Sequence, residues 1–554
     1  MNKLGSSRFF PLLVALGVVV GIIIGSFYAN HFAGRRLNII NNSSNKINDL
    51  LHLIDDQYVD KVNINDLVEK SLPEILKQLD PHSTYISAAD VEASMQELKG
   101  SFSGIGVSFS VFNDSIHIIS VIQGGPSERA GLQAGDRIVF INNKKYVGSN
   151  LSKEDIPKLL KGPKGTRVKV GVVRPGRNGM INISIVRGDV PVKSIDAVYM
   201  ADKTTGYIRI NSFGDTTYPE FLAALAKLNS ENFKGLIIDL RGNLGGYMEP
   251  AIQIAKEFLP KNRLIVYTEG RRSPRENFSS DGRGSYQNLP LVVLVDETSA
   301  SASEIFAGAM QDNDRATIIG RRTFGKGLVQ VPIQFRDGSM LRLTKARYYT
   351  PSGRCVQKPY KPGDEEDYDK DLLLRAEHGE FFSRDSIKTN GKKYHTRIGR
   401  VVYGGGGIIP DIFVPRDTTG MTAYFKEAYF NGLIYQFSCI WVDRNRNSLK
   451  QFNTLPLLTR HLYKEKIVSQ FANYAATKGL KRRNLMIKKS HSLFESYING
   501  YIIDNVLGTS PAVEYANWFD PAMKDALYLM RNGKAFPQLP SKKGNSIKQN
   551  GHRR

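Results

Sequence analysis

The chain has 554 residues, of which 41% are hydrophobic and 23% charged, and its formal net charge is +23. This length predicts several domains, and the composition is that of a globular protein. The basic residues are spread along the chain without a nucleic-acid-binding motif, so we expect no nucleic-acid partner. Cys355 and Cys439 are far apart and no HExxH motif occurs, so we expect no disulfide framework, no metal and no other cofactor.

The N-terminal segment, residues 1–36, contains an uncharged run at residues 9–27 that follows two basic residues. The length of this run fits a membrane-spanning helix better than the core of a signal peptide, so an uncleaved anchor is our prediction and a signal segment the alternative. Arg35 and Arg36 follow the run, so positive charges lie at both ends and do not predict which end of the helix faces the cytoplasm. Glycines at every fourth position indicate either a helix contact in a homo-oligomer or the frequency of glycine in spans: Gly17, Gly21 and Gly25.

Two patterns follow the anchor. Residues 37–100 have apolar side chains at helical spacing, interrupted by a turn at residues 79–85, and predict a helical region. From residue 101 the period changes to two, as in the alternation of Val107 and Phe109. Short strands separated by turn signals predict a compact β domain over residues 101–190.

The central region, residues 191–418, alternates between apolar strands and helices. Strands are expected at residues 206–210, 236–240 and 291–295, and helices at residues 218–228 and 301–312. This alternation predicts an α/β core. Residues 361–393 are charged and without clear periodicity, and we expect an insertion or long loop there. Residues 419–554 predict a helical extension that ends in a basic tail.

A block of small residues around Ser301 starts the expected helix at residues 301–312. A hydroxyl at this position is a candidate nucleophile, and the helix start supplies N–H groups for a developing oxyanion. The alternative is a capping box formed by Ser301 and Glu304, and the two interpretations are compatible. Ser299 and Ser303 are rival nucleophiles that spacing does not exclude.

Lys326 lies between Gly325 and Gly327 and is the candidate base, because no histidine occurs in either block. A lysine base must be neutral near pH 7, which requires a dry pocket that lowers its pKa. One alternative is an exposed lysine on a glycine turn. A phosphate-binding loop at residues 320–327 is disfavoured, because glycine replaces the Mg²⁺-binding hydroxyl and residues 328–332 do not begin a helix.

A glycine turn at residues 242–246 follows the strand expected at residues 236–240. Its amides could face a substrate carbonyl, although most such turns are only turns. The turn does not have the G-x-G-x-x-G spacing of a dinucleotide-binding loop.

Several of these segments together resemble the carboxyl-terminal processing proteases, peptidase family S41. They are Ser-Ala-Ser-Ala-Ser-Glu at residues 299–304, Asp312, and Thr-Phe-Gly-Lys-Gly-Leu-Val-Gln at residues 323–330. The turn Arg-Gly-Asn-Leu-Gly-Gly at residues 241–246 also resembles the family, with leucine where proline is frequent. Residues 351–354 and 407–411 look like further family segments, and the resemblance covers roughly residues 45–415.

The resemblance implies a role for each of five residues. Ser301 would be the nucleophile, Lys326 its general base, and Gln330 a third member that supports the lysine. Backbone amides of Gly246 and Ala302 would form the oxyanion hole. Asp312 also matches the family and receives no chemical role. Lys326 and Gln330 would be adjacent on a helical turn and well apart on a straight strand, and the sequence leaves both geometries open.

Residues 101–190 resemble a PDZ domain. The run Gly104, Ile105, Gly106 and Val107 looks like its carboxylate-binding loop, and residues 130–138 look like its helix-to-strand turn. Glycine loops expose amides to a terminal carboxylate, and the adjacent strand edge can take up an extended peptide. The alternative is an ordinary small β domain.

The sequence therefore predicts an α/β multidomain protein with five parts: an anchor (1–36), a helical region (37–100), a PDZ-like domain (101–190), an S41 protease core (191–418) and a helical extension (419–554). We expect a serine endopeptidase that cuts protein substrates near their C-termini. Its PDZ-like domain would bind the substrate tail. The anchor would hold it in the inner membrane by a single pass, facing the periplasm. The alternative function is a catalytically silent PDZ adaptor at the membrane.

Overall fold

The computed structural model describes residues 18–21, 42–96, 99–112, 115–148, 155–389 and 392–539. The predicted anchor at residues 9–27 lies outside the described residues, except for residues 18–21. No helix in the described ranges is both long and apolar enough to cross a membrane. The chain divides into two compact units, Met1–Leu76 and Lys77–Arg554.

The predicted helical region at residues 37–100 is helical in its first half. It contains α3 (Asn42–Gln57) and α4 (Ile64–Lys77), followed by the short strand β1 (Thr84–Ile86) and the short helix α5 (Val91–Met95). Of the turn expected at residues 79–85, residues 79–83 lie between α4 and β1 and the last two belong to β1. Within the second unit, β1 pairs with a strand of the α/β core, so this segment is part of that core.

The β domain is closed by pairing of its first and last strands, β2 (Ser101–Gly104) and β9 (Gly188–Pro191). Between them a sheet has the order β3-β4-β5-β7-β8, which leaves one edge of β3 (Val107–Phe112) unpaired in the described part of the chain. The alternating residues of the sheet face a core that the short helices complete. The remaining elements are β4 (Ser115–Val121), α6 (Pro126–Arg129), β5 (Arg137–Ile141), β6 (Lys144–Lys145), α7 (Asp155–Leu160), β7 (Arg167–Val173) and β8 (Met180–Val186).

The α/β core is built on a six-stranded sheet of order β10-β11-β12-β15-β16-β21. All neighbours are parallel except β10 and β11. Strands β12, β15 and β16 are buried along their whole length, and β15 is an uninterrupted apolar run, as expected for a strand covered on both faces. The strands are β10 (Ile195–Met200), β11 (Thr205–Ile210), β12 (Gly235–Asp239), β15 (Leu291–Val295), β16 (Thr317–Gly320) and β21 (Ile412–Phe413).

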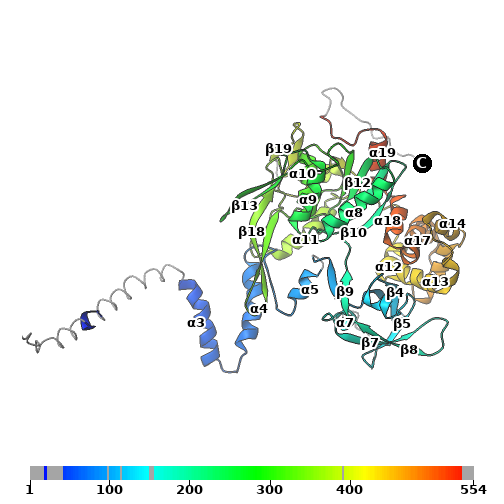
Figure 1. The fold of residues 1–554 in the computed structure, drawn as a ribbon, viewed down its shortest axis with the longest axis horizontal. Coiled ribbons are helices and arrows are strands. Elements are labelled where there is room, and N and C mark those ends of the chain that lie inside the picture. The colour runs from blue at the N-terminus through cyan, green and yellow to red at the C-terminus, as the bar shows by residue number, and fades with distance from the viewer. Residues whose placement is uncertain are drawn as a thin grey trace, which may run out of the picture. The chain divides into compact units, whose positions relative to one another are not determined.

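Helices cover both faces of this sheet (Figure 1). One face packs against α8 (Thr217–Ser230), α9 (Met248–Phe258) and α10 (Ala302–Asp312). The other face packs against residues of α18 (Thr509–Asn517) and α19 (Pro521–Arg531). The strands and helices expected at residues 206–240 and 291–312 are therefore confirmed. The helix layer on the second face of the predicted α/β core comes from the C-terminal part of the chain.

A second, antiparallel sheet completes the core and was not predicted. Its order is β1-β18-β13-β14, with β17 also pairing with β18. The pairing of β1 with β18 joins residues far apart in sequence, which local patterns do not reveal. The strands are β13 (Leu264–Gly270), β14 (Ser273–Ser279), β17 (Leu328–Gln334) and β18 (Met340–Tyr349).

Of the insertion or long loop expected at residues 361–393, the long loop is wrong. This segment contains the 13-residue helix α11 (Glu365–Glu377) and the short helix η2 (Arg384–Ser386), and strand β19 (Lys393–His395) begins at its end and pairs with β20 (Val401–Tyr403). The periodic signal was weak because only Tyr368 and Arg375 of α11 are buried.

The C-terminal extension is mainly helical in its described residues, as predicted, and the predicted basic tail beyond residue 539 lies outside them. Its first helices pack around an aromatic core that includes Trp441, Phe471 and Phe494. Figure 1 shows α13, α14 and α17 gathered in one bundle. The helices are α12 (Ala423–Phe430), α13 (Leu433–Leu449), α14 (Leu455–Leu462), α15 (Ile467–Thr477), α16 (Asn484–Lys489) and α17 (His491–Leu507).

Candidate active site

Ser301 is the N-cap of α10 and has a φ of 55°. A positive φ is uncommon for serine and is a form of backbone strain that clusters at functional sites. The Ser301 N–H donates to Glu304 Oε2 over 2.9 Å, as the capping-box interpretation expects. The hydroxyl lies in a small cleft that Lys326 also lines.

The two rival serines, Ser299 and Ser303, are buried and their hydroxyls bond to backbone carbonyls. The Ser299 hydroxyl donates to the Leu240 carbonyl over 2.8 Å, and the Ser303 hydroxyl donates to the Asn243 carbonyl over 3.1 Å. Both residues have 0% exposure. Ser301 is therefore the serine of the three that faces the cleft.

The Glu304 carboxylate links the two sequence blocks through four hydrogen bonds. Oε2 accepts from the backbone N–H groups of Ser301 (2.9 Å) and Lys326 (2.8 Å). Oε1 accepts from the Thr323 hydroxyl (2.5 Å) and the Gly325 N–H (2.8 Å). One buried side chain thus fixes the serine backbone relative to the lysine backbone. The sequence had indicated only a helix cap for Glu304.

Tyr348 on β18 reinforces the same junction. Its buried hydroxyl lies 3.1 Å from the Ser301 carbonyl oxygen and 2.7 Å from the Lys326 carbonyl oxygen. The two blocks are therefore held together through both their N–H and their C=O groups.

Lys326 lies in the loop before β17, and its Nζ donates to Gln330 Oε1 over 3.3 Å. The pairing of β17 with β18 shifts register between Val329 and Gln330. A bulge of this kind bends a strand and redirects its side chains. The Gln330 amide in turn donates to the His82 carbonyl. The geometry that the sequence left open is thus a loop and a bulged strand, rather than a helix.

The environment of Lys326 favours its neutral form. Burial lowers the pKa of the Lys326 ammonium, and the nearby positive charge of Arg342 lowers it further. The carboxylates of Asp80 and Glu304 act in the opposite direction, and the pKa remains below its ordinary value. The exposed-lysine alternative is therefore wrong.

The turn at residues 242–246 packs directly on the nucleophile block. A Cβ on Gly245 would lie 2.7 Å from the Ala300 carbonyl oxygen and 2.7 Å from Ser301 Cβ. Gly246 lines the cleft. In the described structure neither the Gly246 N–H nor the Ala302 N–H donates a hydrogen bond to another group. Two free amides beside a serine can hold an oxyanion.

The turn at residues 79–85 contributes residues that the sequence analysis missed. The Asp80 carboxylate accepts from the Ser83 N–H (2.9 Å), the Ser83 hydroxyl (2.6 Å) and the Thr344 hydroxyl (3.0 Å). His82 supplies the carbonyl that holds Gln330, and burial, followed by the Lys326 charge, lowers the pKa of His82 to about 4. The available signal was a turn rich in side chains that bond to their own backbone.

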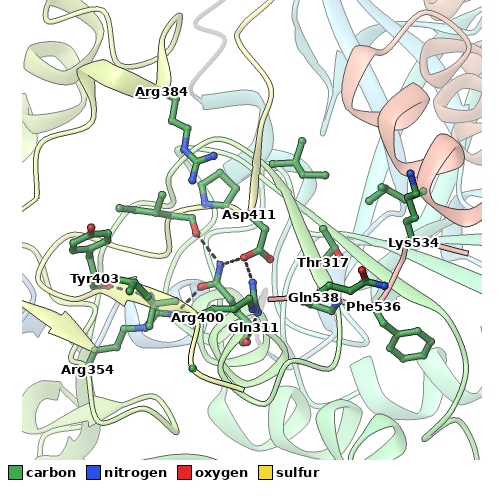
Figure 2. Close-up of a pocket in the computed structure, with 18 residues that line it drawn as sticks. Gln311, Thr317, Arg354, Arg384, Arg400, Tyr403, Asp411, Lys534, Phe536 and Gln538 are labelled. Carbon is green, nitrogen blue, oxygen red and sulfur yellow. Dashed lines mark hydrogen bonds and ion pairs between the residues drawn. The ribbon is translucent and has the colours of Figure 1, made fainter. Parts of the chain in front are cut away.

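Two other family-like segments, residues 351–354 and 407–411, supply Arg354 and Asp411, which bond to the Gln311 side chain at the opposite end of α10 (Figure 2). The Asp312 carboxylate pairs with the fully buried Arg354 at 2.7 Å. Arg400 donates to the Gln311 carbonyl (2.9 Å) and pairs with Asp411 (2.5 Å). Cations near the last carbonyls stabilise a helix C-terminus. Asp312, to which no role was assigned, therefore helps to anchor the helix that starts at Ser301.

The PDZ-like loop has free donors as well. Gly106 has a φ of 75°, and the carbonyls of Ile105 and Gly106 accept from Ser127 and Ile122. No hydrogen bond within the described residues uses the Ile105 or Gly106 N–H groups. The loop leads into the unpaired edge of β3, where Val107 begins the strand.

Comparison with known proteins matches residues 204–368 to peptidase family S41, residues 103–185 to the PDZ domain, and residues 424–508 to a family of unknown function. The carboxy-terminal-processing protease of Bartonella bacilliformis is 36% identical over 317 residues, which cover 56% of this chain and 72% of that protein. This chain belongs to the carboxy-terminal-processing protease family. It is a serine peptidase of family S41 with a PDZ domain.

A further curated relative and a solved structure are also similar to this chain. The carboxy-terminal processing protease CtpA of Bacillus subtilis is 35% identical over 314 residues, which cover 56% of this chain and 66% of that protein. The solved structure of the photosystem II D1 C-terminal processing protease is 28% identical, and the match covers 57% of this chain and 90% of that chain, with a TM-score of 0.32.

Within the described residues, no group of three or more His, Cys, Asp or Glu side chains is placed to hold a metal ion.

Proposed function

We propose that Ser301 is the nucleophile and Lys326 the general base of this processing protease. One observation carries the proposal: the Glu304 carboxylate accepts hydrogen bonds from the backbone N–H groups of both residues. Both residues line the same cleft. The lowered pKa of Lys326, caused mainly by burial, supports its role as a base.

The proposed reaction runs through an acyl-enzyme. Ser301 Oγ attacks the scissile carbonyl while Lys326 Nζ takes its proton, and Gln330 orients the amine. The amides of Gly246 and Ala302 stabilise the oxyanion. The C–N bond then breaks as Lys326 returns the proton to the leaving amine. Water then attacks the ester while Lys326 takes its proton. The bond from the acyl carbon to Ser301 Oγ breaks, Lys326 returns the proton to Oγ, and the acid product leaves.

A cleavage assay on a protein substrate and on a peptide library tests these roles. Ser301→Ala and Lys326→Ala are expected to lower kcat by at least about 10³-fold, because the two residues act as a unit. Lys345→Ala is the matched control, since Lys345 is exposed on β18 and outside the cleft. Retained cleavage in both cleft variants would contradict the mechanism.

We propose further that the PDZ domain captures the substrate C-terminus. The free N–H groups of Ile105 and Gly106 would bind the terminal carboxylate, and the open edge of β3 would pair with the preceding residues. Binding of one peptide with a free or an amidated C-terminus tests this role. The free acid is expected to bind at least about tenfold more tightly, the value of one charge-assisted contact. Equal affinities would contradict it.

We also propose that residues 9–27 anchor the enzyme in the inner membrane by a single pass, with the protease in the periplasm. The uncharged length of this run supports the proposal. Carbonate extraction of membranes is expected to leave the full chain in the pellet and to release a chain that lacks residues 1–36. Protease treatment of spheroplasts is expected to degrade the catalytic domain. Release of the full chain, or protection of that domain, would contradict the proposal.

A further inference from the structure

The charged side chains known to line the catalytic cleft are positive. The cleft is a cavity of about 230 Å³. Among the lining residues that the structure describes, Lys326 and Arg342 are charged and none carries a carboxylate. Most of the other lining side chains are apolar: Met95, Leu244, Met248, Ile305, Leu328, Val329 and Pro332. Low-dielectric walls strengthen the attraction between a charge in such a cleft and an opposite charge on the substrate.

Arg342 is held by neutral groups. It lies on β18, opposite Thr84 of β1 and Pro332 of β17. Its Nη2 donates to the Ser94 carbonyl over 3.0 Å and lies 3.9 Å from Met95 Sδ.

No carboxylate in the described structure pairs with Arg342, whereas several other arginines of the core have such partners: Arg209, Arg241, Arg321, Arg354 and Arg400. Arg315 also lacks a carboxylate partner, but its guanidinium donates to three backbone carbonyls. A guanidinium has five N–H donors, so the two contacts of Nη2 leave most of the Arg342 donors available.

We propose that Arg342 is a specificity-determining residue that binds a carboxylate of the substrate close to the scissile bond. This inference rests on the proposed function, because it takes the cleft of Ser301 and Lys326 as the site of cleavage. Arginine suits the role, since its planar donors match a carboxylate in a two-point contact. The cleft therefore prefers an acidic residue over a neutral one and disfavours a basic one.

The carboxylate could come from an acidic side chain or from the free end of the substrate chain. In the proposed function the PDZ loop holds the free end, so the acidic side chain is the source that we assign to Arg342. The proximity of the two cations supports the assignment. The Arg342 charge lowers the pKa of Lys326, so an anion bound at Arg342 also lies within electrostatic reach of the base.

A peptide series with Glu, Gln or Lys at one position at a time, amidated at the C-terminus, tests the proposal. The wild-type enzyme is expected to process the Glu peptide with about tenfold higher kcat/KM than the Gln peptide at one position, the value of one charge-assisted contact. This ratio falls to about one in Arg342→Gln, and Arg342→Glu prefers the Lys peptide. Arg347→Gln is the matched control, since Arg347 is exposed on the same strand and keeps the wild-type ratio.

Three outcomes would overturn the proposal: a wild-type ratio near one at every position, an unchanged ratio in Arg342→Gln, or a preference that appears only with a free C-terminus. If the Arg342 variants do not fold, binding of the amidated Glu and Gln peptides to Ser301→Ala gives the same ratio without changing Arg342. The proposed function fails separately, if Ser301→Ala still cleaves the Gln peptide.

Discussion

Glu304 shows how one side chain can organise a two-residue site. Burial raises the pKa of this carboxyl group to about 7. Its four donors favour the ionised form, because an ionised carboxylate only accepts hydrogen bonds. The residue does not face the reacting atoms, so we regard it as a positioning residue. Replacing Glu304 should therefore change kcat, through the positions of Ser301 and Lys326, more than KM.

Glu304→Gln is expected to lower kcat by roughly 10²-fold, because an amide N–H₂ facing backbone N–H groups displaces the reacting atoms. KM should change much less, since the cleft walls remain. Steady-state kinetics measure both values. Glu249→Gln is the control, because Glu249 is an exposed acid in the first turn of α9. Wild-type kcat in Glu304→Gln would show that the carboxylate does not position the pair.

The pH dependence of kcat/KM should report Lys326 directly. A general base acts when it is deprotonated, so activity rises as pH increases through the pKa of Lys326. Burial and the Arg342 charge place that pKa below the ordinary 10.5. Arg342→Gln should move this ascending limb to higher pH, because it removes a positive charge that disfavours the ammonium. Asp80 and Glu304 oppose this effect and remain in the variant. A limb that shifts to lower pH would contradict this assignment.

At the scale of elements, helix α10 is fixed at both ends. Glu304 and Tyr348 bind its N-terminal junction, and Arg354 and Arg400 bind its last turn. The glycine turn at residues 242–246 then presses against its start. The family-like residues that seemed scattered in the sequence thus surround one helix.

Gly245→Ala is expected to reduce kcat by at least about 10²-fold, because the new Cβ would collide with backbone at Ala300 and with Ser301 and displace the nucleophile. Gly242→Ala is the matched control. Gly242 lies in the same turn and has a φ of 77°, but a Cβ there would meet nothing within 4 Å. Equal loss of activity in both variants would indicate backbone strain as the cause, rather than the contact with Ser301.

Local patterns predicted the elements that carry the nucleophile. The apolar run at residues 291–295 and the Ser301-to-Glu304 cap specify a strand and the start of a helix without help from distant residues. The β1–β18 pair was missed because Thr84 meets Arg342 across a long sequence separation. The sequence left the geometry between Lys326 and Gln330 undecided for a similar reason. The bulge that brings the two side chains together depends on the pairing of β17 with β18.

At the scale of the whole molecule, the C-terminal extension is part of the protease fold. Met523 and Leu529 of α19 pack on the second face of the parallel sheet. Arg241, in the turn after β12, pairs with Asp520 at the start of α19 over 2.8 Å. The division at residues 418 and 419 remains a prediction, and helices beyond it cover the sheet that positions the site.

Met523→Ala is expected to destabilise the protein by about 2–5 kcal/mol, the usual cost of truncating a buried methionine. Tyr528→Ala on the same helix should have little effect, because Tyr528 is 58% exposed. Urea denaturation followed by tryptophan fluorescence measures the difference. Similar midpoints for Met523→Ala and the wild type would show that α19 contributes little to the core.

Labelling by a fluorophosphonate probe tests most directly the central claim that Lys326 activates Ser301. Intact mass and peptide mapping should place one adduct on Ser301 in the wild type. The adduct should be absent in Ser301→Ala and form at least about 10²-fold more slowly in Lys326→Ala, because the serine then lacks its base. An adduct on Ser299 or Ser303, or equal labelling rates with and without Lys326, would contradict the claim.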